Sequence, residues 1–228
     1  MRNIFLGAVM STTLAFTAAG DAQSAASVEE VVSPGGIRGY LLHEPAVPML
    51  AVSFLFKGGA QYESADEAGL ARMTAALLDE GAGEMDSQAF RAALEDNAIR
   101  LSFDADRDGI NGELRTLTAN RELAFELLRQ ALAEPRFDAE PIERIRAQLQ
   151  AGLKRRLNDP GVISRRAWFA AAFGEHSYAH PAEGRVETVA ELGREAIVGY
   201  HAVQFARDKL HIGVAGDITA EELAPALD

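Results

Sequence analysis

The chain has 228 residues, of which 48% are hydrophobic and 25% are charged, and it contains no cysteine. This composition is that of an ordinary globular protein and excludes the disordered and fibrous classes. Without cysteine there are no disulfides, no thiolate chemistry and no cysteine-ligated metal sites. The formal net charge of −12 and the pI of about 4.9 argue against nucleic acid and anionic membrane surfaces as partners.

The first 25 residues have the pattern of a secretory signal peptide. Arg2 precedes an apolar run that extends from Ile4 to about Ala19, and small residues follow around Ala22 and Ala25. The alternative is a buried or anchoring N-terminal helix, but the run is short and rich in Ser, Thr and Gly for a membrane span. We therefore expect a signal peptide at residues 1–25, a mature domain at 26–228 and a periplasmic or secreted protein without membrane contact after signal removal.

The predicted elements begin with strands and turn helical near residue 66. Residues 28–32 and 37–42 flank a Pro-Gly turn and predict a β-hairpin. The apolar run at 49–56 predicts a strand that is covered on both faces. A helix over about 66–80 follows, and its apolar or small positions predict one buried stripe. The stripe consists of Leu70, Met73, Thr74, Leu77 and Leu78.

Beyond Gly83 the spacing of the apolar residues changes from helical to alternating and then back to helical. A helix capped by Asp86 or Ser87 is followed by alternating residues at 101–105 and 110–116, which predict a second hairpin with one wet face. Helices are predicted at 120–133, 139–158, 162–173, 186–192 and 193–205, a strand at 210–214, and a last helix with a capping box after Thr219. This order predicts an α+β fold, with a mostly antiparallel sheet packed against several helices.

Motifs with self-evident chemistry are missing from the sequence. It has no GxSxG nucleophile elbow and no phosphate-binding glycine loop. His176 and His180 have the spacing of a metal pair, but the nearby Pro181 argues against a helix there, and further ligands are not evident. Seven basic residues lie between Arg144 and Arg166; a solvated helix face explains them most simply, and contact with an acidic partner or substrate is the alternative.

A family resemblance appears in the run FLFKGGAQYESADEAGLARMTAALLDEGAG at residues 54–83. It resembles the segment of pitrilysin/insulinase-type zinc metallopeptidases, the inverzincins, in which Gly-Leu-Ala leads into the motif H-x-x-E-H. DNAIRLSFDADRDGINGEL, RFDAEPIERIRAQLQAGLKRRLNDP and LHIGVAGDIT resemble later parts of the same domain. The resemblance covers residues 28–228 and implies the first domain of a clamshell, with a second homologous domain absent, so a fragment is expected.

None of the family's zinc-binding motif residues is present at the corresponding positions of this sequence. If Gly69-Leu70-Ala71 is aligned with the family's Gly-Leu-Ala, Arg72 occupies the first ligand position. Ala75 then occupies the position of the general base, and Ala76 that of the second ligand. The third ligand, a glutamate in the family, falls at Gly152 or Ala151. None of these side chains can ligate zinc or take a proton from its water. The resemblance therefore implies a non-catalytic member that is inactive alone, has no metal ligands and needs no cofactor.

The resemblance also implies what such a domain binds. Inactive subunits of processing-peptidase-like pairs assist a catalytic family member as heterodimers, and substrate peptides or unfolded segments add to the edge of the sheet. By resemblance, the residues that line this site are Gly58, Gly59, Leu101, Ser102, Phe103, Asp104 and Ala105. A structural or peptide-binding subunit without a proteolytic partner is the alternative. We further expect Arg72 to pair with Glu63, Asp66 or Glu67.

Overall fold

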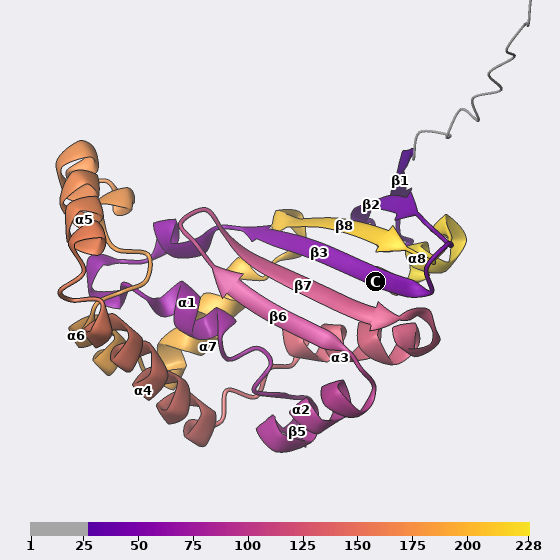
Figure 1. Cartoon of the computed structure of the whole chain (residues 1–228), viewed down its shortest axis with the longest axis horizontal. Coiled ribbons are helices and arrows are strands. Elements are labelled where there is room, and N and C mark those ends of the chain that lie inside the picture. Colours follow the sequence, from indigo (N-terminus) through magenta and orange to yellow (C-terminus); the bar gives the residue numbers. More distant parts are fainter. Residues whose placement is uncertain (1–26) are drawn as a thin grey trace, which may run out of the picture.

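A computed structural model describes residues 27–228, so the predicted signal peptide lies outside the described residues. Six strands form one twisted sheet with most of the helices packed on one of its faces (Figure 1). In spatial order the strands are β1 (Val28–Val32), β2 (Arg38–His43), β8 (Leu210–Gly216), β3 (Met49–Lys57), β7 (Gly109–Leu117) and β6 (Arg100–Ala105). Only β2 and β8 pair in parallel; every other pairing in this sheet is antiparallel. The predicted α+β class is confirmed.

The helices follow the predicted order. They are α1 (Leu70–Ala75), α2 (Ser87–Asp96), α3 (Arg121–Ala133), α4 (Ala139–Arg155), α5 (Pro160–Phe173), α6 (Val186–Glu191), α7 (Arg194–Gln204) and α8 (Ala220–Ala226). Short 3-10 turns lie at η1 (Gly59–Tyr62), η2 (Ala65–Glu67), η3 (Thr118–Asn120), η4 (Ser177–Ala179) and η5 (Arg207–Lys209). A small hairpin joins β4 (Gly81–Ala82) to β5 (Met85–Asp86). Within residues 27–228, no helix combines the length and the apolar character that crossing a membrane requires.

Strand β3 corrects one prediction. Its residues alternate, so that Val52 and Phe54 are buried under the helices while Ala51 and Ser53 are exposed on the opposite face. The prediction of a strand covered on both faces was therefore wrong for the described residues. Single apolar residues are common on protein surfaces, so an apolar run does not by itself require a second cover. The sheet consequently has one face packed on helices and one open face.

Helix α1 is shorter than the sequence pattern indicated. The predicted stripe is buried, with Met73 and Leu78 both at 0% exposure. However, Gly69 adopts a left-handed φ of 102° and starts the helix only at Leu70. The chain then tightens after Ala75, because the amide of Leu78 donates to the carbonyl of Ala75 three residues back. The apolar periodicity located the buried face but not the two ends of the helix.

Candidate functional site

The first turn of α1 is held by a buried carboxylate. Glu63, with 8% of its surface exposed, accepts hydrogen bonds from the amides of Gly69 at 2.8 Å and Ala71 at 2.5 Å. These are amides that a helix start leaves without a partner inside the helix. The backbone at Gly69 lies close to neighbouring segments: a Cβ placed on Gly69 would stand 3.0 Å from the side chain of Val189 and 3.1 Å from the backbone of Gly184. Glu63 therefore fixes the start of the helix on which the positions of the family's metal motif fall.

Arg72 does not form the expected ion pair. The side chain is half-buried, and among the described residues no carboxylate lies within salt-bridge distance of it. The prediction of a pair with Glu63, Asp66 or Glu67 was wrong, and two of these carboxylates have other partners. Glu63 points at the helix amides, and Glu67 instead accepts a hydrogen bond from the Ser64 hydroxyl at 2.9 Å.

The other motif positions are equally unsuited to zinc. Ala75 is buried with 1% exposure, Ala76 is half-buried, and neither has a side-chain donor atom. Helix α4 packs against α1, but its Gly152 has no side chain that could ligate a metal. The atom nearest to a Cβ placed on Gly152 is a guanidinium nitrogen of Arg155, at 3.9 Å. Within residues 27–228 no three His, Asp or Glu side chains come together as a metal site would require. The residues present here do not fit the family's zinc ion.

The predicted substrate-binding strand lies at the edge of the sheet. Strand β6, which contains Leu101 to Ala105, pairs with β7 on one side only, and α1 packs against it (Figure 1). Gly58 and Gly59 lie beside the turn that joins β6 to β7, since the amide of Gly58 donates to the carbonyl of Asp108 at 2.8 Å. The structure thus brings together α1, which holds the motif positions without the metal ligands, the turn at Gly58 and Gly59, and the edge strand β6.

The alternation of hydrogen-bonded and non-hydrogen-bonded pairs between β6 and β7 determines which amides of β6 are free. The amide of Asp106 donates to the carbonyl of Gly109, which marks the closing pair of the hairpin. Because hydrogen-bonded and non-hydrogen-bonded pairs alternate in an antiparallel ladder, Ser102 and Asp104 direct their backbone groups toward β7. The backbone groups of Leu101 and Phe103 consequently point away from the sheet. No other described group forms a hydrogen bond with them.

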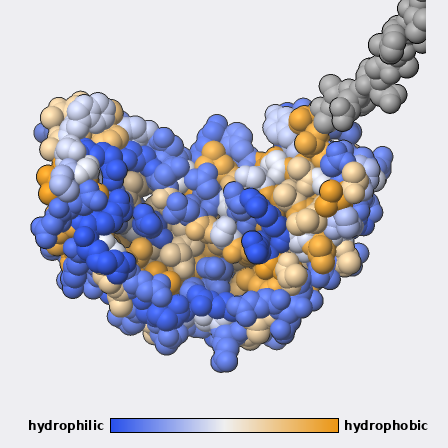
Figure 2. Space-filling view, in the orientation of Figure 1, coloured by the Kyte–Doolittle hydropathy of each residue, from blue (hydrophilic) through white to orange (hydrophobic). Residues whose placement is uncertain are grey.

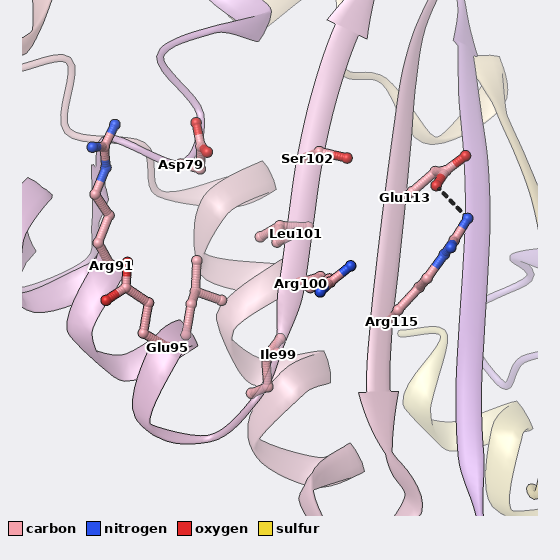
Figure 3. Close-up of a pocket in the computed structure, with 10 residues that line it drawn as sticks. Asp79, Arg91, Glu95, Ile99, Arg100, Leu101, Ser102, Glu113 and Arg115 are labelled. Atoms are coloured by element: carbon pink, nitrogen blue, oxygen red, sulfur yellow. Dashed lines mark hydrogen bonds and ion pairs between the residues drawn. The ribbon is translucent and has the colours of Figure 1, made fainter.

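A groove of about 520 Å³ runs beside this edge (Figure 3). Arg91 and Glu95 of α2 and Asp79 from the segment after α1 lie on the free side of β6, and Leu101 points toward them. On the other side of the strand, Arg115 of β7 pairs with its neighbour Glu113 at 3.0 Å. The groove therefore offers charges of both signs next to unpaired backbone groups.

Two carboxyls have raised pKa values, that of Glu63 at the start of α1 and that of Asp79 in the groove. Burial raises the pKa of Glu63 to about 7, against the opposing effect of its two backbone hydrogen bonds. Burial, together with the neighbouring negative charge of Glu80, raises the pKa of Asp79 to about 6. Both carboxyls therefore keep a proton in the folded protein at a pH where the unfolded chain has lost it.

This difference predicts that the fold loses stability as the pH rises. Between the usual glutamate pKa and about 7, the folded state binds more protons than the unfolded state, so the free energy of unfolding decreases with pH. For Glu63 we expect a decrease of about 2 kcal/mol between about pH 5.5 and about pH 8. His201 acts in the opposite direction below about pH 6.5, because burial lowers its pKa.

Urea denaturation at the two pH values measures this effect. The variant Glu63→Gln removes one titrating group and leaves Asp79 and His201 in place, so the difference between its pH profile and that of the original chain isolates Glu63. A pH dependence that is unchanged in Glu63→Gln would contradict the assignment.

The remaining sequence candidates do not form a site. His176 and His180 flank η4 rather than sharing a helix face, and the ring of His176 lies 5.0 Å from that of Tyr178 in an aromatic cluster. Sequence reasoning missed Asp79, Arg91 and Glu95 as groove residues. No local signal marks them, because the groove exists only where α2 and the end of the α1 segment meet β6.

Comparisons with known proteins agree with this architecture. The family model for insulinase, peptidase family M16, matches residues 40–183. A protein of Helicobacter pylori described as the non-peptidase homolog YmxG is 24% identical over 182 residues, which are 80% of this chain and 42% of that protein. A protein of Mycobacterium leprae described as an uncharacterized zinc protease is 26% identical over 215 residues, 89% of this chain and 45% of that protein.

Solved structures share the fold. A peptidase M16 inactive domain from Pseudomonas fluorescens superimposes with a TM-score of 0.82 at 24% identity, covering 88% of this chain and 50% of that one. The periplasmic protease PqqL from Escherichia coli gives a TM-score of 0.75 at 13% identity, covering 88% of this chain and 23% of that one. The chain spans less than half the length of the curated relatives it matches. With the family model matching most of the chain and the motif positions vacated, the chain belongs to the insulinase family of peptidases, family M16, as a homologue without the H-x-x-E-H motif.

Proposed function

We propose that this domain binds extended peptides or unfolded protein segments without cleaving them and assists a catalytically active family member in proteolysis. The observation that carries the proposal is the free edge of β6 beside the vacated motif helix. An extended chain can add to such an edge through main-chain hydrogen bonds, which give affinity without strict sequence demands. The charged groove along the same edge would receive alternate side chains of the bound segment.

Other observations support parts of this proposal. The relative described as a non-peptidase homolog and the structure described as an inactive domain are family members named for lacking activity. The signal-like first 25 residues and the likeness to a periplasmic protease support a periplasmic or secreted location. Zinc is not expected as a cofactor, because the ligand positions hold Arg72, Ala76 and Gly152.

Hydrogen exchange of individual amides tests the binding mode. We expect an unstructured peptide of about 15 residues to slow exchange at the amides of Leu101 and Phe103, which face the free edge. The amides of Ser102 and Asp104 should be slow already in the free protein, because they belong to the ladder with β7. The same strand thus supplies its own internal control.

A peptide of identical sequence with N-methylated amides is the matched probe. Each lost hydrogen bond weakens binding by about 0.5–1.5 kcal/mol, so the loss of three predicts at least about tenfold weaker binding. Equal affinity of the two peptides, or protection elsewhere than on β6, would contradict edge addition. Stoichiometric zinc in the purified protein, together with cleavage of the peptide, would contradict the non-catalytic part of the proposal.

A further inference from the structure

The second half of helix α5 is apolar around its whole circumference. From Ala167 to Phe173 the sequence reads AWFAAAF, seven residues without a polar side chain. Seven residues make nearly two helical turns, so every side of this part of the helix is apolar. A helix that is hydrophobic all round is normally covered on all sides by other protein.

In the structure only one side of α5 is covered. The helix stands at one end of the molecule and packs mainly on η4 (Figure 1). On the inner side, Phe169 and Phe173 stack at 5.5 Å and Tyr178 packs on Phe173 at 5.3 Å. Away from this contact, Trp168 is 60% exposed on one flank of the helix and Ile163 is 53% exposed on the other. Within residues 27–228 nothing covers the outer side, where Trp168 lies.

The charges around the apolar surface are mainly positive. Arg165 of α5 is exposed, as are Lys154 and Arg155 at the end of α4, only a few residues before α5 begins. Arg107 lies over the ring of Phe169 at 3.9 Å and shares a small depression with Arg165. The whole chain is strongly acidic, with a net charge of −12, so this corner contrasts with the molecule as a whole. In Figure 2 apolar and hydrophilic surface lie side by side on the lobe that α5 forms.

The neighbouring acidic side chains offset only part of this positive charge. Glu175 is exposed just after the end of α5, and Asp108 accepts a hydrogen bond from the hydroxyl of Tyr178. Asp159 caps α5 by accepting hydrogen bonds from the amides of Gly161 and Val162. Glu183 pairs with Arg166 at 3.2 Å, and the pair is therefore balanced. Lys154, Arg155 and Arg165 form no ion pair with any described residue, so their charge is available to a partner.

We propose that the outer face of α5 is the docking surface for an acidic partner protein, in which Trp168 inserts into an apolar patch ringed by carboxylates. Large aromatic side chains and arginine dominate binding energy at protein interfaces, while complementary charge steers the encounter. The inference rests on the proposed function, because the partner is the catalytically active family member. It places that partner on α5, so that the edge of β6 stays open for peptide.

Trp168 makes the proposal measurable without a label, because it is the only tryptophan of the chain. The probe is a tryptophan-free version of a relative from the same organism that has an intact H-x-x-E-H motif. When this relative binds, we expect the emission of Trp168 to shift to shorter wavelength and its quenching by acrylamide to decrease. Binding followed by calorimetry should weaken at least about thirtyfold in Trp168→Ala, the size of an interface hot spot. Arg165→Glu should slow association and reduce its dependence on salt.

Matched variants on the open face of the sheet serve as controls. Tyr40→Ala removes another aromatic side chain, 53% exposed, and Arg38→Glu reverses another exposed charge. Both should bind the relative as the original chain does, and circular dichroism should show that all four variants are folded.

The outcomes separate the two proposals. Binding that leaves Trp168 exposed, or that depends on Tyr40 instead, overturns the α5 surface and leaves the pairing intact. No binding by any version overturns the pairing and the α5 surface together. A short-wavelength emission in the isolated protein would overturn the inference, either because a second copy covers α5, if sedimentation gives a dimer, or because the chain itself covers it.

Discussion

Replacing Glu80 by alanine should lower the free energy of unfolding by about 3 kcal/mol, the lower end of the range for breaking a buried ion pair. The Glu80 side chain is 2% exposed and accepts hydrogen bonds from Arg144 at 2.5 and 3.0 Å and from Ser87 at 2.5 Å, and it also pairs with Arg91. Burial alone would raise its pKa, but the hydrogen bonds from Arg144 and Ser87 and the charge of Arg91 hold the pKa below its usual range.

The estimate stays at the lower end because the two arginines keep contact with water. The side chain of Arg144 is 30% exposed and that of Arg91 is 48% exposed, so neither is stranded when the carboxylate is removed. The loss comes mainly from the interactions that join α4 and α2 to the segment after α1. Urea denaturation at neutral pH measures it.

An exposed ion pair provides the control. Glu126 accepts two hydrogen bonds from Arg129, both at 2.9 Å, and these hold its pKa near 2, but about half of either side chain is exposed. Water screens such a pair, so Glu126→Ala should change the free energy of unfolding by no more than about 1 kcal/mol. Equal losses in the Glu80 and Glu126 variants would show that burial is not what makes the Glu80 cluster important.

The difference between these two glutamates illustrates what sequence can predict here. Glu126 and Arg129 are three residues apart on one helix, and that spacing is visible in the sequence. Glu80 and Arg144 are 64 residues apart, and no local pattern joins them. Periodicity predicted the buried stripe of α1 and both hairpins, because each depends on residues that are neighbours in the chain.

The ends of α1 show the opposite case. Helical periodicity continues on both sides of it, yet the helix begins at Leu70 because Glu63 caps its first amides and because Gly69 packs against Gly184. The strand order likewise depends on β8 inserting between β2 and β3, a pairing of residues far apart in the chain. The vacated motif could be located from the family resemblance, whereas the groove beside β6 required the assembled fold.

Gly59→Ala should lower the free energy of unfolding by at least about 2 kcal/mol, since two costs add. Gly59 has a φ of 59°, a left-handed conformation that costs other residues about 1–3 kcal/mol. In addition, a Cβ there would stand 2.5 Å from the carbonyl oxygen of Asp106 and 2.6 Å from the amide nitrogen of Gly109. Both are backbone atoms of the β6–β7 turn, so they cannot rotate away, and overpacking of this kind costs about 1–3 kcal/mol more.

Gly36 is the matched control for the backbone cost. It also has a positive φ, of 89°, but nothing lies within 4 Å of a Cβ placed on it. Gly36→Ala should therefore lower the free energy of unfolding only by the cost of the positive φ, about 1 kcal/mol. Thermal or urea denaturation of the two variants measures the difference, and equal losses would mean that contact with the β6–β7 turn costs nothing.

The contact at Gly59 also links this turn to peptide binding. Gly58 and Ala60 donate to the carbonyls of Asp108 and Asp106 at 2.8 and 2.9 Å, and the hydroxyl of Tyr200 donates to the carbonyl of Gly59 at 3.0 Å. Pushing the turn away would shift the end of β6, whose outward amides are the proposed binding groups. At a temperature where Gly59→Ala remains folded, peptide should therefore protect the amide of Phe103 less than in the original chain, whereas Gly36→Ala should leave this protection unchanged. Full protection in Gly59→Ala would show that the glycine turn serves stability alone.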